Sequence, residues 1–329
     1  SVVAPKATVS FQVNFPQTYP ATIELKKGTG FVTSFDDKIY KFVTIEDYKA
    51  GVINGQAFFN NVEVYEGSLV TDTFTVDTSR AGQQFLLSNG SADTSTIRTK
   101  VYPIETATEF AYYNQINNII DIGASDGIFY VDENLDEQYE LFFGDGVIGK
   151  ALENNNFIEV SYLVSSGSAA NNASVFTFSG VLTDTNGISF PNNVTNITTV
   201  FPAQGGADIE NIDSIKNNAP KLYATQNRAV TSNDYAAIVR KIYPAISDII
   251  TYGGEEERYP EFGKVKIVIK PNSGSTLSTR TKQEIIAGLK DYAVASVTPE
   301  IKDPSILYLE LDSRINYNTR ITNQFPEDI

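Results

Sequence analysis

The 329-residue chain contains no cysteine, histidine, methionine or tryptophan. Without cysteine it has no disulfide, no thiol nucleophile and no thiolate-bound zinc or iron–sulfur cluster. Without histidine it has neither a Ser-His-Asp triad nor an imidazole metal ligand. Any catalysis would have to use carboxylates, Lys, Tyr, Arg, Ser or the backbone.

Basic residues are also scarce. Lys and Arg number 25 against 40 Asp and Glu, which gives a formal net charge of −15 and a pI near 4.5. This balance argues against nucleic-acid binding, which needs basic stripes that displace counterions. No apolar run reaches the roughly 18 residues of a membrane-spanning helix, and residues 1–16 lack the basic start and apolar centre of a signal peptide. We therefore expect no nucleic acid and no membrane as partner.

The distribution of residue types predicts a predominantly β, α+β fold with several domains. Residues 1–99 and 100–204 are rich in β-branched and aromatic residues broken by turn signals, and predict two β-rich modules. Within the second, Ile158, Val160 and Tyr162 alternate as in a half-buried strand. Residues 205–329 predict an α+β module compatible with a ferredoxin-like sandwich. Its expected helices are 209–219, 232–243 and 279–294, and its expected strands are 246–252, 264–270 and 306–317.

A glycine-rich stretch between two expected strands matches the dinucleotide-binding glycine pattern and all but the last position of a P-loop. Its key residues are Gly144, Asp145, Gly146 and Gly149. Both nucleotide motifs need a helix directly afterwards, so that its N-terminus meets the phosphates. Residues 151–156 leave no room for that helix before the next strand. We therefore interpret 144–149 as a glycine turn.

Two acidic stretches are near misses for catalytic or metal sites. The run 132–137 begins like a calcium loop, but its sixth position is Glu137 where glycine is required, and its twelfth is Phe143. The carboxylates of 255–257 and Glu261 lie in a loop bounded by Gly and Pro, and such charge runs are usually solvated. We expect no catalytic residue, metal, cofactor or small-molecule substrate, and hence a protein that is not an enzyme.

The most specific motif follows residue 204. It consists of Gly205, Gly206, Asp208 and Glu210, and then of Arg228, Thr231, Asp234 and Tyr235 at the start of an expected helix. Thr231 or Ser232 is the expected N-cap. This pattern resembles the signature of the baseplate J-like family of contractile-tailed phages and related injection machines. Lys27–Phe31 and the block Phe143–Gly149 with Val160–Tyr162 are similar to earlier parts of the family pattern, in the same order.

Within that family, the length and the Asn- and Thr-rich composition are most similar to the C-terminal half of the ring-forming wedge subunit of T-even-like phages. The resemblance implies a structural component of a tail baseplate. Such subunits pair with themselves, form a ring around the tail hub, hold the wedges together and reorganise to trigger sheath contraction and genome delivery. It implies other wedge and hub proteins as partners, a virion location after assembly in the host cytoplasm, and no cofactor.

Several expectations remain open at this point. The chain begins with Ser rather than Met, so we expect a fragment from which an N-terminal portion is missing. Gly205–Gly206 is a hypothetical hinge between modules. The abundance of Asn, Thr and Tyr also fits a surface-exposed carbohydrate-binding β-protein, and the carboxylates fit a hydrolase. We expect some of the 18 Tyr and 20 Phe to lie at protein interfaces.

Overall fold

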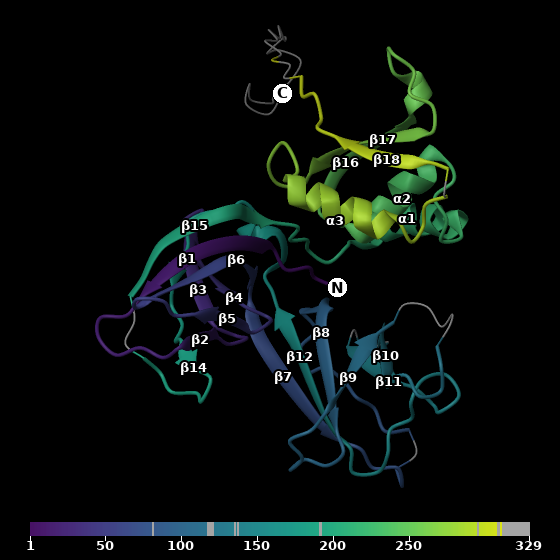
Figure 1. Cartoon of the computed structure of the whole chain (residues 1–329). Coiled ribbons are helices and arrows are strands. Elements are labelled where there is room, and N and C mark those ends of the chain that lie inside the picture. Colours follow the sequence, from purple (N-terminus) through teal and green to yellow (C-terminus); the bar gives the residue numbers. More distant parts are fainter. Residues whose placement is uncertain are drawn as a thin grey trace, which may run out of the picture.

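The computed structural model of the chain describes residues 1–80, 82–116, 122–134, 136, 138–190, 193–294, 296–307 and 310. These residues form two six-stranded sheets, two three-stranded sheets and three α-helices (Figure 1). The expected predominantly β character is confirmed. None of the helices in this part of the chain combines the length and apolarity needed to cross a membrane.

The first six-stranded sheet draws its strands from both ends of residues 1–204. In spatial order they are β13 (Thr177–Phe178), β3 (Gly30–Phe35), β4 (Lys38–Val43), β6 (Gln56–Glu66), β1 (Lys6–Asn14) and β15 (Asn193–Gln204). A small sheet consists of β14 (Thr183–Asp184), β2 (Thr22–Leu25) and β5 (Tyr48–Gly51). Val9 and Phe11 of β1 alternate with more exposed residues and belong to the same apolar core as Ile23 and Leu25 of β2. The two sheets therefore share one core.

The second six-stranded sheet has its own core. Its order is β11 (Tyr139–Phe143), β10 (Ile128–Glu133), β9 (Ala111–Gln115), β8 (Ala92–Tyr102), β12 (Phe157–Val164) and β7 (Ser68–Thr75). The expected common face of Ile158, Val160 and Tyr162 is confirmed, because all three side chains are fully buried in this core. A short 3₁₀ turn, η1 (Gly167–Ala170), follows β12.

An apolar cluster of Ala4, Val43 and Leu163 brings together residues from the N-terminal segment, β4 and β12, and so joins the two large sheets. The Ser165 hydroxyl adds a hydrogen bond of 2.6 Å to the Glu66 carboxylate. We call residues 1–204 the β body. Apolar contacts of this kind hold its sheets in one arrangement.

The helical module, residues 212–302, follows the β body (Figure 1). Its helices are α1 (Ile212–Thr225), α2 (Ser232–Ile242) and α3 (Thr279–Leu289), and its strands are β16 (Ile246–Gly253), β17 (Lys264–Pro271) and β18 (Thr298–Lys302), with a 3₁₀ turn, η2 (Gly254–Glu256). β16 pairs antiparallel with β17, and β17 pairs parallel with β18 after the crossover through α3. Ile238 of α2 and Ile285 of α3 pack with Ile267 of β17 in a separate core.

Parts of the expected organisation differ from this arrangement. The boundary expected between residues 99 and 100 falls inside β8. Each of the two large sheets contains strands from before and from after this boundary. Whether 1–99, 100–204 and 205–329 fold as units stays a prediction, as does the ferredoxin-like topology. Most of the strand expected at 306–317 lies outside the described residues, and the sequence did not predict β18.

Candidate functional site at the junction of the β body and the helical module

The glycine stretch of the sequence forms a tight turn after β11. The Asp145 carboxylate accepts hydrogen bonds of 2.8 Å from the backbone N–H groups of Val147 and Ile148, and these bonds lower the pKa of Asp145. Gly146 N–H donates to Gly149 O at 3.0 Å. Gly149 has a φ of +76°, and a Cβ there would lie 2.2 Å from a side-chain carbon of Ile128. No helix follows before β12, as the sequence predicts.

The residues after β15 are bound to the β body. The side chain of Asn171 forms two hydrogen bonds with Gly206, donating to its carbonyl at 2.8 Å and accepting from its N–H at 3.0 Å. A Cβ on Gly206 would lie 2.4 Å from Pro5 Cγ. Asp208 accepts hydrogen bonds from the backbone and hydroxyl of Ser168 at 3.0 and 2.7 Å. Gly206 is thus held on both sides, and the hinge at Gly205–Gly206 stays a prediction. Gly205 has a φ of +85°, which favours glycine.

Glu210, in contrast, contacts the first helix of the helical module. Its carboxylate accepts hydrogen bonds from the Ser214 hydroxyl at 2.5 Å and from the Asn218 amide at 2.8 Å, both on α1. The Asn211 side chain caps α1 by accepting from Ser214 N–H. Ile209 lies between the last contact with the β body and the first contact within the helical module, and its side chain is 61% exposed.

The rest of the motif builds the start of α2. Thr231 and Asp234 form a capping box, in which the Thr231 hydroxyl accepts from Asp234 N–H and the Asp234 carboxylate accepts from Thr231 N–H. Tyr235 is fully buried in the core, where burial raises its pKa, and its hydroxyl has no hydrogen-bond partner among the described residues. The Arg228 side chain is exposed, and the backbone N–H of Arg228 donates a hydrogen bond to the backbone carbonyl of Thr225 at 2.9 Å.

The twelve motif residues thus lie at three places: the turn after β11, the linker after β15 and the start of α2. Each group has a structural explanation in its own hydrogen bonds or packing. The structure does not gather them into one site.

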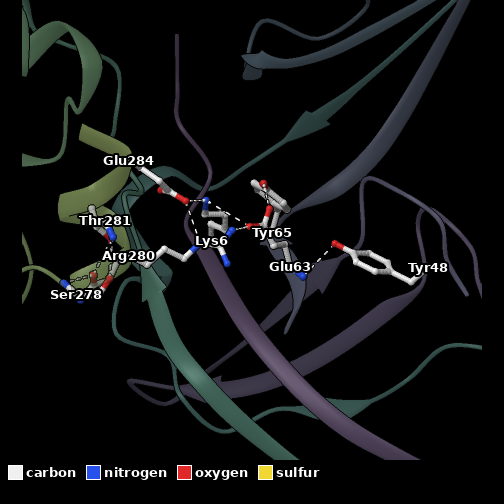
Figure 2. Close-up of polar contacts among 9 residues, drawn as sticks. Lys6, Tyr48, Glu63, Tyr65, Ser278, Arg280, Thr281 and Glu284 are labelled. Carbon is white, nitrogen blue, oxygen red and sulfur yellow. Dashed lines mark hydrogen bonds and ion pairs between the residues drawn. The ribbon is translucent and has the colours of Figure 1, made fainter. Parts of the chain in front are cut away.

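Sequence reasoning missed a charged cluster between the β body and the helical module (Figure 2). Lys6 of β1 lies 2.7 Å from the carboxylate of Glu284 on α3 and 3.8 Å from that of Glu63 on β6. The Arg280 guanidinium contacts Glu63 and lies 3.0 Å from Glu284. We call Lys6, Glu63, Arg280 and Glu284 the junction network. Only the Arg280–Glu284 pair, four residues apart on one helix, has a sequence signal, because the other pairs depend on long-range folding.

Two tyrosines hold Glu63 in place. The Tyr65 hydroxyl donates to the Glu63 carboxylate at 3.0 Å, and the Tyr48 hydroxyl accepts from Glu63 N–H at 3.1 Å. Burial raises the pKa of Tyr65 far above its ordinary value, so this phenol stays a donor. For Glu284, burial raises the pKa, but hydrogen bonds from Lys6 and Arg280 outweigh it and leave the pKa below its ordinary value. Glu284 therefore stays charged at neutral pH.

Further polar contacts cross the junction. Gln204 at the end of β15 accepts hydrogen bonds from Ser278 N–H at 3.3 Å and from the Thr281 hydroxyl at 3.4 Å, at the start of α3. The Asn172 side chain donates to the Ser273 hydroxyl. A cavity of about 180 Å³ lies beside Gln204, Ser278 and Thr281, and Lys6 and Glu284 also line it.

The acidic loop differs from expectation. Glu261 lies 2.7 Å from both Lys264 and Lys266, and Glu257 is paired with Lys302. These carboxylates are therefore ion-paired rather than simply solvated, because β17 and β18 present lysines on the face opposite the helices. In the other acidic run, Glu137 lies outside the described residues.

The C-terminal part of the chain is similar to a family of baseplate proteins. Residues 231–302 match the model of a family described as baseplate structural protein gp6, C-terminal domain I. This range contains most of the helical module, from the capping box of α2 to the end of β18.

Most of the chain is also similar to one particular baseplate protein. The chain is 25% identical over 313 residues to the baseplate wedge protein gp6 of Enterobacteria phage T4, which covers 90% of this chain and 46% of that protein. The chain thus spans about half the length of this relative. The resemblance to a gp6-like baseplate protein is confirmed.

Two solved assemblies overlap the chain less closely. The baseplate of the anti-feeding prophage matches at 14% identity and a TM-score of 0.25, over 91% of this chain and 57% of the other. The TssK-TssF-TssG baseplate subcomplex of the type VI secretion system matches at 7% identity and a TM-score of 0.35, over 95% and 92%. Neither superposition is close enough to support an argument.

Proposed function

We propose that the chain is a structural, non-catalytic component of a contractile-tail baseplate wedge. In this proposal it pairs with a second copy, contributes to a ring around the tail hub, holds the wedges together and reorganises to trigger sheath contraction and genome delivery. Its other partners are wedge and hub proteins, it needs no cofactor, and its location is the virion tail baseplate after assembly in the host cytoplasm. The observation that carries the proposal is the similarity to a baseplate wedge protein along 90% of the chain.

A helix in the structure offers an apolar surface for such pairing. In α1 only Thr225 is buried. Ile212, Ile215 and Tyr223 are 63%, 42% and 87% exposed, and their spacing places them on one side of the helix. Exposed apolar stripes of this kind are typical of protein interfaces.

Light scattering on a sizing column tests the self-pairing. The monomer mass is 36.1 kDa. We expect twice that mass, stable as the protein is diluted, and reversion to the monomer in the variant Tyr223→Asp. Ile39→Asp is the matched control, because Ile39 is 81% exposed on β4 of the β body. A monomer at every concentration would contradict self-pairing through this part of the protein.

A further inference from the structure

We propose that the junction network is an ionic latch, which fixes the orientation of the helical module on the β body and releases without unfolding either part. The latch is a property of the chain itself. Its use in baseplate reorganisation rests on the function proposed above.

The first argument comes from the apolar cores. Among the described residues, no apolar cluster combines side chains of the β body with side chains of the helical module. By contrast, Ala4, Val43 and Leu163 bind the two large sheets of the β body to each other. Apolar clusters therefore resist movement within the β body, whereas charges and hydrogen bonds resist movement at the junction, where no such cluster is present among the described residues.

The second argument is the position of the linker contacts. Val3 and Ala207 exchange backbone hydrogen bonds of 2.9 and 3.0 Å, and Asp208 is held by Ser168, so the chain is bound to the β body up to this point. Glu210 already contacts α1. The backbone at Ile209 is therefore the pivot about which the helical module turns.

The third argument is the exposure of the charged groups. The side chains of the junction network are between 24% and 44% exposed, and a cavity of about 180 Å³ adjoins them. Ion pairs at this exposure are weak individually and are screened by salt. Several of them together hold one orientation at low ionic strength, and none is buried deeply enough to make release costly.

Single-molecule energy transfer tests the latch directly. The chain has no cysteine, so Ile39→Cys on β4 and Tyr259→Cys in the β16–β17 loop give one label on each part; these residues are 81% and 77% exposed. An excess of unlabelled chain leaves at most one labelled copy in any dimer, so the transfer is measured within one chain whether or not the chain pairs. The readout therefore stays informative even if the proposed pairing fails, and the light-scattering result does not depend on it.

We expect a narrow distribution of transfer efficiency at about 0.05 M NaCl that broadens and shifts at about 1 M, where the Debye length falls to about 3 Å. Glu63→Gln with Glu284→Gln should give the broad distribution at both salt concentrations. The variant with exchanged charges, Glu63→Arg with Arg280→Glu, should give a distribution at low salt that is narrower than that of the double Gln variant. Unchanged far-ultraviolet circular dichroism establishes that both parts remain folded.

The matched control is Lys282→Gln on the same helix. It removes the ion pair of 2.7 Å with Asp303, which does not cross the junction. This variant should behave as the parent chain does. A parent distribution that salt does not change, or a double Gln variant that keeps the narrow distribution, would overturn the latch.

Discussion

At the scale of single residues, a buried lysine fixes the outer face of the sheet in the helical module. The Lys266 side chain is 1% exposed, and its ammonium lies 2.7 Å from both Glu261 and Glu300. Burying this cation is costly, and the two carboxylates offset the cost. Hydrogen bonds from Lys264 and Lys266 lower the pKa of Glu261 to about 2. The base of the β16–β17 loop is therefore held by charge.

This pKa makes the stability of the chain depend on pH. Because the pKa of Glu261 is lower in the folded chain, its contribution is present above about pH 4.5 and is lost as pH falls towards about 2. We expect the urea midpoint to fall less steeply over this range in Glu261→Gln than in the parent chain. Glu255→Gln, on the same loop, is the control and should follow the parent. Equal slopes in all three proteins would show that the Glu261 ion pairs do not stabilise the fold.

At the scale of elements, the family motif is partly a helix-capping device. The prediction of a helix from 232 is confirmed by α2, which starts at Ser232 with Thr231 as N-cap. We expect Thr231→Ala to lower the free energy of unfolding by about 1 kcal/mol, because it leaves an amide of the first turn without its acceptor. Thr231→Ser retains the hydroxyl and should cost much less. Chemical denaturation of the two variants measures the difference, and equal losses would mean that the cap contributes little.

Local signals predicted element types better than element ends. The helix expected at 209–219 is α1, which continues past Pro220 to Thr225, and in this last part Leu222 packs against the core of the helical module. The helix expected to end at 294 stops at Leu289, where the chain turns so that Ala293 pairs with Ala229. Long-range contacts decide both ends, and they are not visible in a single segment.

The same limit applies to the candidate site. Capping residues, the glycine turn and strand alternation are local patterns, and the sequence predicted them. The pairing of Lys6 with Glu284, 278 positions apart, depends on the path of the whole chain. The sharing of one sheet by β1 and β15 is equally non-local. Sequence reasoning therefore predicted the helix that carries Arg280 and Glu284, but it missed the network that connects this helix to the β body.

At the scale of the whole molecule, separate apolar cores imply separate unfolding transitions. Ile267 is fully buried in the core of the helical module, and Ile158 is fully buried in the second sheet of the β body. Because no apolar cluster of the described residues spans the junction, the polar contacts there couple the two parts only weakly. Calorimetry should therefore resolve two transitions whose separation is largest at high salt.

The same isoleucine replacement in each part assigns these transitions. Ile267→Ala should lower the free energy of unfolding of the helical module alone, by about 2–5 kcal/mol. Ile158→Ala should lower that of the β body alone. Salt that screens the junction network should remove any remaining coupling between the two transitions. It should change the free energy of unfolding of each separate part much less. If either variant lowers both transitions equally, the chain unfolds as one cooperative unit. The helical module would then have no freedom to turn at Ile209 while folded.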